Sequence, residues 1–503
     1  MASLNKVVRS APIFTHEGLK AMKINPEQQL RRSVLSCLLW ENTFYESGED
    51  IATRISNIAA QCDPLFVYNL AMEARHVHGL RHVPLLLLID LIKRKNYVVT
   101  GKEGEEGFIK VKHAIANVIR RPDELMELVS LYWKDKKKNG VKVPVKMSDR
   151  QLRDGLALAF DKFDEYSLAK YDNQGREVKL RDVLFLSHAK PKNEERAKLY
   201  KKIAEKKLVT PDTWETAISA AGSDQEKKKA EWQRLLDNTL NMDHKERDGR
   251  LGYMALLRNL RNMLQVGLNR AQIGAAVVAR RDSQLVLPFR YIAAARAAKE
   301  LEPFIDTAFQ ASVKELIPLK GTTAVLVDVS GSMDSPLSSK SDLTRIDAAC
   351  ALAVLIQGDK RIFSFSDRTV EVPARAGMAG IDAIKDSQRH SSTRMSEAIN
   401  FVNANVKHDR LIVISDEQAM ATGQGRGNRY GYGYATGGTL PKPKAELPYM
   451  INVASYENGV GYGEWLHLDG FSEGIIKFIQ IMEAEYFDVI QTEVTQKTVE
   501  GVK

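Results

Sequence analysis

Three oxygen-bearing side chains lie within five residues of one another, directly after an apolar run. Residues 324–327 are apolar without a break, which is typical of a parallel strand that is buried on both faces. Asp328 follows the run, and Ser330 and Ser332 come next at alternate positions. A hard divalent cation prefers such oxygen ligands, with a carboxylate for charge and small hydroxyls for further positions. The stretch predicts a metal-binding loop, although a polar turn after a strand would show the same three residues.

Two later segments supply oxygen atoms that would complete such a site. Thr393 precedes the helix-like pattern of residues 395–402, and Asp416 follows the apolar run 411–415. In an open α/β sheet, the loops after the carboxyl ends of the strands converge where the strand order reverses. We therefore expect these side chains to meet at one edge of a sheet. The predicted metal ligands are Asp328, Ser330, Ser332, Thr393 and Asp416.

The order Asp-x-Ser-x-Ser, then threonine, then aspartate closely resembles the metal-ion-dependent adhesion site of von Willebrand factor A domains. The resemblance implies a doubly wound α/β sheet that carries Mg²⁺ or another divalent cation. It also implies that one coordination position of the metal is open to an acidic group of a partner. The chain has a matching residue at all five positions of the motif.

Length and composition indicate a protein of several domains. At 503 residues the chain exceeds one ordinary core, and its 44% hydrophobic content is usual for a globular protein. The longest apolar run, residues 83–89, is far shorter than a membrane span, and the N-terminal residues lack the apolar core of a signal peptide. The cysteines, Cys37, Cys62 and Cys350, are too far apart for a Cys-x-x-Cys motif. These features predict a cytoplasmic protein without a membrane segment.

The formal net charge of +9 is divided unevenly along the chain. Residues 1–300 hold 53 Lys and Arg against 38 Asp and Glu, whereas residues 301–503 hold 20 against 26. A basic excess confined to one part predicts a polyanion-binding region joined to a region of another kind. A basic surface exposed only to solvent would give the same count, so charge by itself leaves both interpretations open.

Residues 26–316 show an almost entirely helical pattern, in which apolar residues recur at intervals of three and four. Short helices cannot bury an apolar stripe alone and must stack on their neighbours, which favours a helical-repeat solenoid. After residues 318–321, strand and helix patterns alternate, which indicates an α/β domain. The expected helices include residues 51–61, 64–78, 83–95, 108–119, 123–133, 346–356 and 474–482, and the expected strands include residues 362–365, 411–415 and 449–454.

Residues 168–192 place basic side chains around an expected helix whose buried edge is Val183, Leu184 and Leu186. Long cations near a helix end suit phosphate contacts, and Tyr171 can stack on a base. The segment is therefore a predicted RNA-binding site. Its basic or potentially basic residues are Lys170, Arg176, Lys179, Arg181, His188, Lys190 and Lys192.

The same segment resembles the signature of the Ro autoantigen, or TROVE-domain, family. The likeness lies in Lys-Tyr at residues 170–171, in Arg176, and in Asp-Val-Leu-Phe-Leu-Ser-His-Ala-Lys-Pro at residues 182–191. It extends to residues 250–264 and 288–297 and to the metal-site motif. The resemblance implies an all-α ring of HEAT-like helical repeats closed by a von Willebrand factor A domain, which is the domain order deduced above.

Two positions depart from the pattern of eukaryotic relatives. This chain has Lys179 and Leu180 where those relatives commonly show Ser-His, and it has Phe185 where they have arginine. The basic character of the segment survives these changes.

A second polar stripe lies within residues 250–269. Leu256, Leu257, Leu260 and Leu264 are expected on its packing side. Arginine and amide side chains on another face offer donors to phosphates and base edges, although a solvated helix face would have the same spacing. The resemblance implies that single-stranded RNA ends bind on the inner surface of the ring, where this stripe would lie. Its members are Arg258, Arg261, Asn262, Gln265 and Asn269.

These observations predict an RNA-binding ribonucleoprotein component. The helical RNA-binding domain is expected over residues 1–318 and the von Willebrand factor A-like domain over residues 319–503. By resemblance, the protein binds a small non-coding Y-like RNA and the single-stranded ends of structured or misfolded RNAs. It would serve in RNA quality control or as an adaptor to an exoribonuclease or another acidic partner at the metal.

No enzymatic activity is expected. Phosphoryl hydrolysis usually needs a second metal or a positioned base, whereas the sequence shows no second carboxylate cluster and only His390 beside the metal motif. The alternative function is a Mg²⁺-dependent protein-interaction scaffold without a direct RNA role.

Overall fold

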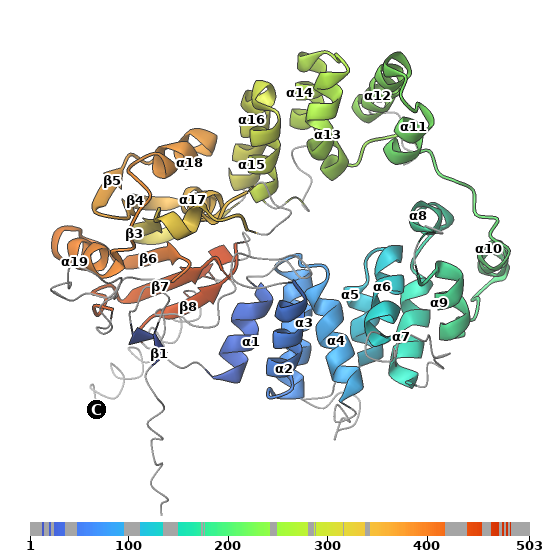
Figure 1. The fold of residues 1–503 in the computed structure, drawn as a ribbon, viewed down its shortest axis with the longest axis horizontal. Coiled ribbons are helices and arrows are strands. Elements are labelled where there is room, and N and C mark those ends of the chain that lie inside the picture. The colour runs from blue at the N-terminus through green and yellow to red at the C-terminus, as the bar shows by residue number, and fades with distance from the viewer. Residues whose placement is uncertain are drawn as a thin grey trace, which may run out of the picture. The chain divides into compact units, whose positions relative to one another are not determined.

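The computed structural model shows a long series of helices followed by a sheet with its own helices (Figure 1). It describes residues 13–14, 20–21, 25–35, 48–94, 111–133, 149–172, 175, 177–241, 249–279, 286, 288–314, 316–337, 343–417, 440–454, 464–471, 475–476, 479–480 and 483. The helices of the first part are α1 (Pro26–Leu35), α2 (Gly48–Ala59), α3 (Pro64–His76), α4 (Val83–Lys93), α5 (Val111–Val118), α6 (Pro122–Trp133), α7 (Arg150–Phe160), α8 (Glu165–Tyr171), α9 (Leu180–Ser187), α10 (Glu194–Ala204), α11 (Trp214–Ala220), α12 (Gln225–Leu240), α13 (Tyr253–Gln265), α14 (Arg270–Ala279), α15 (Pro288–Ala297) and α16 (Glu302–Lys314). The elements of the second part are β3 (Leu319–Asp328), α17 (Arg345–Leu355), β4 (Gly358–Phe365), β5 (Thr369–Val372), α18 (Gly377–Lys385), α19 (Met395–Asn405), β6 (Arg410–Ser415), β7 (Leu447–Asn452) and β8 (Leu466–Asp469). Two short strands, β1 (Ile13–Phe14) and β2 (Lys20–Ala21), pair with each other, and single 3-10 turns lie at η2 (Lys299–Leu301) and η3 (Gly331–Asp334).

Polar caps fix the beginnings of several helices. The Asp63 carboxylate accepts a hydrogen bond of 2.8 Å from the backbone of Leu65 at the start of α3. Asp149 accepts one of 3.0 Å from Leu152 at the start of α7. Such caps satisfy backbone donors that have no partner inside the helix. The expected helices 51–61, 64–78, 83–95, 123–133 and 346–356 are present, with ends that differ by a few residues, as α2, α3, α4, α6 and α17.

Two further expectations lie partly outside the described residues. Helix α5 covers the described part of the helix expected over residues 108–119. Of the helix expected over residues 474–482, the structure describes only four positions.

The chain divides into two compact units. One unit comprises residues 49–286 and 294–308, and the other comprises residues 1–48, 287–293 and 309–503. The predicted boundary between residues 318 and 319 stays a prediction. None of the described helices combines the length and the apolar character that a membrane crossing requires.

Helix α1 belongs to the unit that contains the sheet, where it packs against the edge strand β8. Gly470 directly after β8 has a φ of +118°, and a Cβ atom there would lie 3.0 Å from the Leu35 carbonyl oxygen. Only glycine combines this backbone conformation with so close an approach. The end of α1 thus rests against the end of β8.

The sheet has the strand order β5-β4-β3-β6-β7-β8, with β5 antiparallel and the other strands parallel. From β3 the chain proceeds to β4 and β5 on one side, and then returns to β6, β7 and β8 on the other side. The strand order therefore reverses between β3 and β6, so this is the topological switch point at which α/β sheets bind ligands. The strands expected at residues 362–365, 411–415 and 449–454 correspond to β4, β6 and β7.

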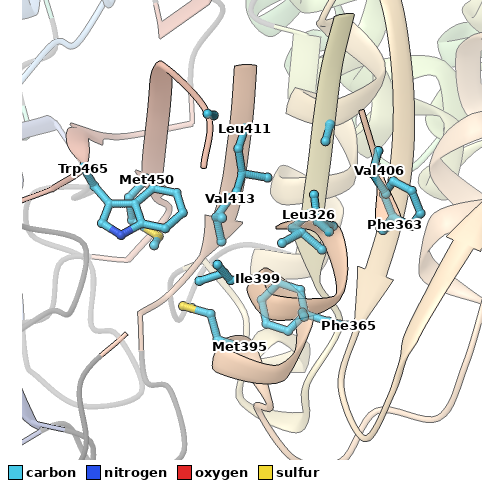
Figure 2. Packing of buried hydrophobic residues seen from close by; sticks show 14 residues of the cluster. Leu326, Phe363, Phe365, Met395, Ile399, Val406, Leu411, Val413, Met450 and Trp465 are labelled. Carbon is cyan, nitrogen blue, oxygen red and sulfur yellow. The ribbon is translucent and has the colours of Figure 1, made fainter. Parts of the chain in front are cut away.

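Both faces of the sheet are covered. On one face, Leu326, Phe363 and Val413 pack with Met395 and Ile399 of α19 (Figure 2). The residues that alternate with these along the strands point to the other face and are also buried, and α17 packs against β3 and β6. This double burial explains the uninterrupted apolar runs, because both faces of each central strand need apolar side chains.

Candidate metal centre and nucleic-acid interface

Asp328 and Asp416 lie together at the carboxyl ends of the two central strands. Asp328 ends β3, Asp416 follows β6, and these neighbouring strands are paired in parallel up to Val327 and Ile414. Both carboxylates are fully buried. Because β3 and β6 flank the reversal of strand order, the fold alone brings the two acidic residues to the same point.

Ser330, Ser332 and the loop before α19 complete the cluster. The hydroxyl oxygens of Ser330 and Ser332 are 3.3 Å apart. The backbone N–H of Gly331 donates to the Ser391 carbonyl at a distance of 3.1 Å, which joins the Asp-x-Ser-x-Ser loop to the segment that carries Thr393. Thr393 is buried two residues further on. The structure thus draws the five predicted ligands from three loops toward one edge of the sheet.

The electrostatics of the centre favour a bound cation. Burial, reinforced by the nearby Asp416 carboxylate, raises the pKa of the Asp328 carboxyl to about 7, although hydrogen bonds from Ser330 and Ser415 oppose the rise. Two buried carboxylates repel each other, and Arg345 pairs with only one of them, Asp416. A divalent cation between the two would relieve the remaining repulsion. The donor set of carboxylate and hydroxyl oxygens fits Mg²⁺ or another hard cation.

Three residues of this centre were not predicted from the sequence. Ser415 donates a hydrogen bond of 2.6 Å from its hydroxyl to Oδ2 of Asp328, and it accepts one of 2.9 Å from the backbone N–H of Glu417. Glu417 is buried in the left-handed conformation, with a φ of 60°, and its carboxylate bonds to the ring of His467 on β8. A chain of hydrogen bonds therefore leads from the turn at Glu417 through Ser415 to the metal-site aspartate. Only the position of Ser415, directly before Asp416, offered a signal in the sequence.

Arg345 is a further unpredicted neighbour. Its Nη1 donates to Oδ2 of Asp416 at a distance of 2.9 Å, and both side chains are buried. A buried charge is retained only when it is paired and hydrogen-bonded, and this pairing fixes the orientation of Asp416. The first residue of α17 thereby holds a carboxylate that lies 71 residues further along the chain.

His390 does not stand free beside the centre. Its Nδ1 lies 2.8 Å from Oδ1 of Asp334, and its Nε2 lies 2.8 Å from the carbonyl oxygen of Lys385. With both ring nitrogens engaged, the imidazole ties the end of α18 to the metal loop.

The segment over residues 168–192 presents its predicted RNA ligands unevenly. Arg181, His188 and Lys190 are exposed, whereas Lys170 and Lys179 are half-buried. Arg176 lies outside the described residues. The remaining cation, Lys192, pairs with Asp161.

Tyr171, which the sequence predicts to stack on a base, is half-buried. The guanidinium of Arg121 lies 4.7 Å from the centre of the Tyr171 ring, which is half-buried. Phe185 on α9 is exposed instead, and the Arg181 guanidinium lies 5.6 Å from its ring centre. Arg121 directly precedes α6 and is distant in sequence, so no local pattern around Tyr171 shows that its ring is covered.

Four members of the second predicted stripe lie on one exposed face of α13, whereas Asn269 lies beyond its end, where its Oδ1 accepts a hydrogen bond of 2.8 Å from the Ala271 backbone. Leu256, Leu257 and Leu260 are buried on the opposite side. The amide of Asn262 donates to Oδ1 of Asn259 at a distance of 2.9 Å, which fixes its orientation. The exposed members of the stripe are Arg258, Arg261, Asn262, Gln265 and Asn269.

Residues 204–303 match the family model of the TROVE domain. This part of the chain is similar to a TROVE domain. The match contains α13 and its polar stripe, whereas the segment over residues 168–192 precedes it. The match confirms the resemblance to the Ro, or TROVE-domain, family for residues 250–264 and 288–297.

A solved structure shares the fold of this protein. The Ro (RSR) protein of Deinococcus radiodurans aligns over 90% of this chain and 97% of its own, with a TM-score of 0.52. Its sequence is 16% identical, so this likeness concerns the fold. The predicted fold class, a helical-repeat part followed by a doubly wound von Willebrand factor A-like part, is confirmed.

Proposed function

We propose that this TROVE-domain protein is a non-catalytic RNA-binding protein that holds the unpaired ends of structured or misfolded RNAs. The observation that carries the proposal is the stripe of exposed donors on α13, within the part of the chain that matches the TROVE domain. Arg258 and Arg261 offer guanidinium groups to phosphates, and Asn262 and Gln265 offer amides to base edges. Buried leucines on the opposite side of α13 keep this face pointed away from the packing surface.

A second RNA site is proposed around α9, for a structured RNA of the small, non-coding, Y-like kind. Here Arg181 is exposed near the start of the short helix α9, and His188 and Lys190 are exposed just beyond its end. Cations at a helix end contact phosphates without reading a sequence, which suits the backbone of a stem. The basic excess of residues 1–300 supports long-range attraction of such a polyanion.

The metal centre is proposed to serve as a docking point for an acidic group of a protein partner, such as an exoribonuclease. Asp328, Ser330, Ser332, Thr393 and Asp416 would hold the cation. When bound, Mg²⁺ supplies a positive charge and an open coordination position to a carboxylate of the partner. Arg345 and Ser415 orient the two aspartates before the partner arrives.

The contacts of His390 favour this binding role over catalysis. A general base has to reach the proton that it removes, whereas both nitrogens of His390 are engaged by Asp334 and by the Lys385 carbonyl. Exposed donors on two helices, by contrast, suit the binding of a polyanion.

The proposal is tested by measuring the affinity of the purified protein for a fluorescent hairpin RNA with and without an unpaired 3′ tail. We expect tight binding of the tailed hairpin, and we expect Arg258→Ala with Arg261→Ala to weaken it strongly. The matched control is Lys198→Ala with Lys201→Ala, which removes two exposed cations from α10. Absence of RNA binding by the wild-type protein would favour the alternative function, a Mg²⁺-dependent interaction scaffold. Equal losses of RNA affinity in both double variants would show that the stripe contributes only unspecific positive charge.

A further inference from the structure

Helix α9 carries two flat side chains on one exposed face, and a third directly follows the helix. Arg181 and Phe185 are four residues apart, so they share one side of the helix. His188 follows the last helical residue in the left-handed conformation, with a φ of 51°, and all three side chains are exposed. We name these three residues the α9 platform. The opposite side of the helix is buried through Leu180, Val183, Leu184 and Ser187.

Phe185 is the centre of this platform. Its side chain is 54% exposed, and the Arg181 guanidinium lies 5.6 Å from the ring centre. Single exposed apolar side chains are common on protein surfaces. This one differs because a guanidinium already lies near its ring and the exposed His188 imidazole directly follows the helix. Guanidinium, benzene and imidazole planes are the groups on which proteins stack unpaired bases.

The charges around the platform indicate which class of ligand it can bind. Lys190 is exposed directly beyond the helix. Asp182, the carboxylate within α9, accepts a hydrogen bond of 2.9 Å from the Lys179 backbone and so serves the start of the helix. A cationic surrounding with an aromatic centre complements a ligand with anionic groups and flat uncharged faces. Unpaired RNA has both, whereas a duplex hides its base faces in the stack.

We propose that the α9 platform binds an unpaired nucleobase of RNA, stacked on Phe185, while Arg181 and Lys190 contact the adjoining phosphates. The inference rests on the proposed RNA-binding function and adds to it a determinant for unpaired bases within the site for structured RNA. Tyr171 is less suited to this role, because its ring is half-buried whereas Phe185 is 54% exposed.

The test uses two fluorescent hairpin RNAs and the full-length protein. In one RNA the loop and the tail consist of adenosines, and in the other the same unpaired positions are abasic. Phe185→Leu keeps an apolar side chain but removes the aromatic face, and Phe185→Trp restores a face. Thermal melting of each variant verifies the fold, which an exposed position should not disturb.

We expect Phe185→Leu to weaken binding of the adenosine RNA by roughly five- to hundredfold, the range of one lost base stack. Phe185→Trp should keep the wild-type affinity, and both variants should bind the abasic RNA as the wild type does. The slope of log affinity against log salt should not change, because no phosphate contact is lost.

Two results would overturn the platform while leaving the proposed function intact. One is equal binding of the adenosine RNA by Phe185→Leu and the wild type, which would make the ring a contact for something other than RNA. The other is an equal loss on both RNAs, which would show an indirect effect on the surrounding cations. If the wild-type protein binds neither hairpin, the proposed function fails and the platform fails with it.

Discussion

The metal centre and the RNA-binding helix faces hold their polar side chains in opposite ways. At the metal centre, Asp328 and Asp416 are fully buried, and each has a hydrogen-bond donor from a distant element. On α13, Arg258 and Arg261 stand exposed on a single helix. The buried centre therefore depends on several loops at once, whereas each exposed cation acts largely by itself.

This difference predicts two scales of effect. Substitution of a single buried carboxylate should abolish the function of the whole centre, because no neighbouring residue can replace its hydrogen-bonded oxygens. Exposed cations contribute to RNA affinity by attracting phosphate charges. The effects of substituting several of them add up, and each effect becomes smaller as the salt concentration rises. The following experiments challenge this contrast, beginning with the largest expected effect.

Asp328→Ala should abolish Mg²⁺ binding and leave RNA affinity nearly unchanged. The substitution removes a charged group at the centre of the predicted ligand set, while the basic excess lies in the other part of the chain. Calorimetric titration of Mg²⁺ and filter binding of RNA measure the two effects. Asp359→Ala, at an exposed position near the start of β4, is the control and should retain both Mg²⁺ binding and RNA binding. A large loss of RNA affinity in folded Asp328→Ala would show that the two sites are coupled.

Ser415→Ala should weaken Mg²⁺ binding by roughly ten- to hundredfold, as expected for a residue that orients a metal ligand. The substitution removes the donor to Asp328 and leaves the Glu417 N–H without its acceptor. The free energy of unfolding should fall by about 1–3 kcal/mol, measured by urea denaturation. Ser396→Ala is the matched control, because the buried Ser396 hydroxyl has no hydrogen-bond partner among the described residues. Similar Mg²⁺ affinity in both variants would contradict the role of Ser415.

Removing cations should separate the two RNA sites. Changing Lys170, Arg176 and Arg181 to Ala should weaken a stem-loop far more than an unpaired tail, and Arg258→Ala with Arg261→Ala should do the reverse. Each lost phosphate contact should lower the slope of log affinity against log salt by about 0.9 for a duplex and about 0.7 for a single strand. Affinities measured over a range of salt concentrations give these slopes. Uniform weakening of both RNAs by both variants would indicate one continuous basic surface.

The smallest expected effect is on RNA cleavage. The highly purified protein should leave RNA intact over many equivalents of substrate, because His390 is engaged by Asp334 and the Lys385 carbonyl. Gel analysis of labelled RNA in the presence of Mg²⁺ provides the measurement, with Asp416→Ala as the control. Multiple turnovers by the wild type that disappear in Asp416→Ala would establish an enzyme.

The sequence by itself determined the features that arise from neighbouring residues. Apolar runs identified β4, β6 and β7, and intervals of three and four residues identified α2, α3 and α4. The order of the metal-site motif, together with the rule that loops converge at the switch point, predicted that Asp328 and Asp416 lie at one edge of the sheet. These inferences succeed because strand alternation, helical spacing and strand order follow from local backbone geometry.

Only the tertiary structure decided which of these side chains are covered and which are held. Arg121 covers the ring of Tyr171, while Phe185 stays exposed. Arg345 fixes Asp416 across 71 residues, and Ser415 fixes Asp328 across 87. A sequence pattern shows on which face of an element a side chain lies, but it does not show which distant element packs against that face. Such pairings depend on how the elements pack together, and they set the burial and the charge of each site.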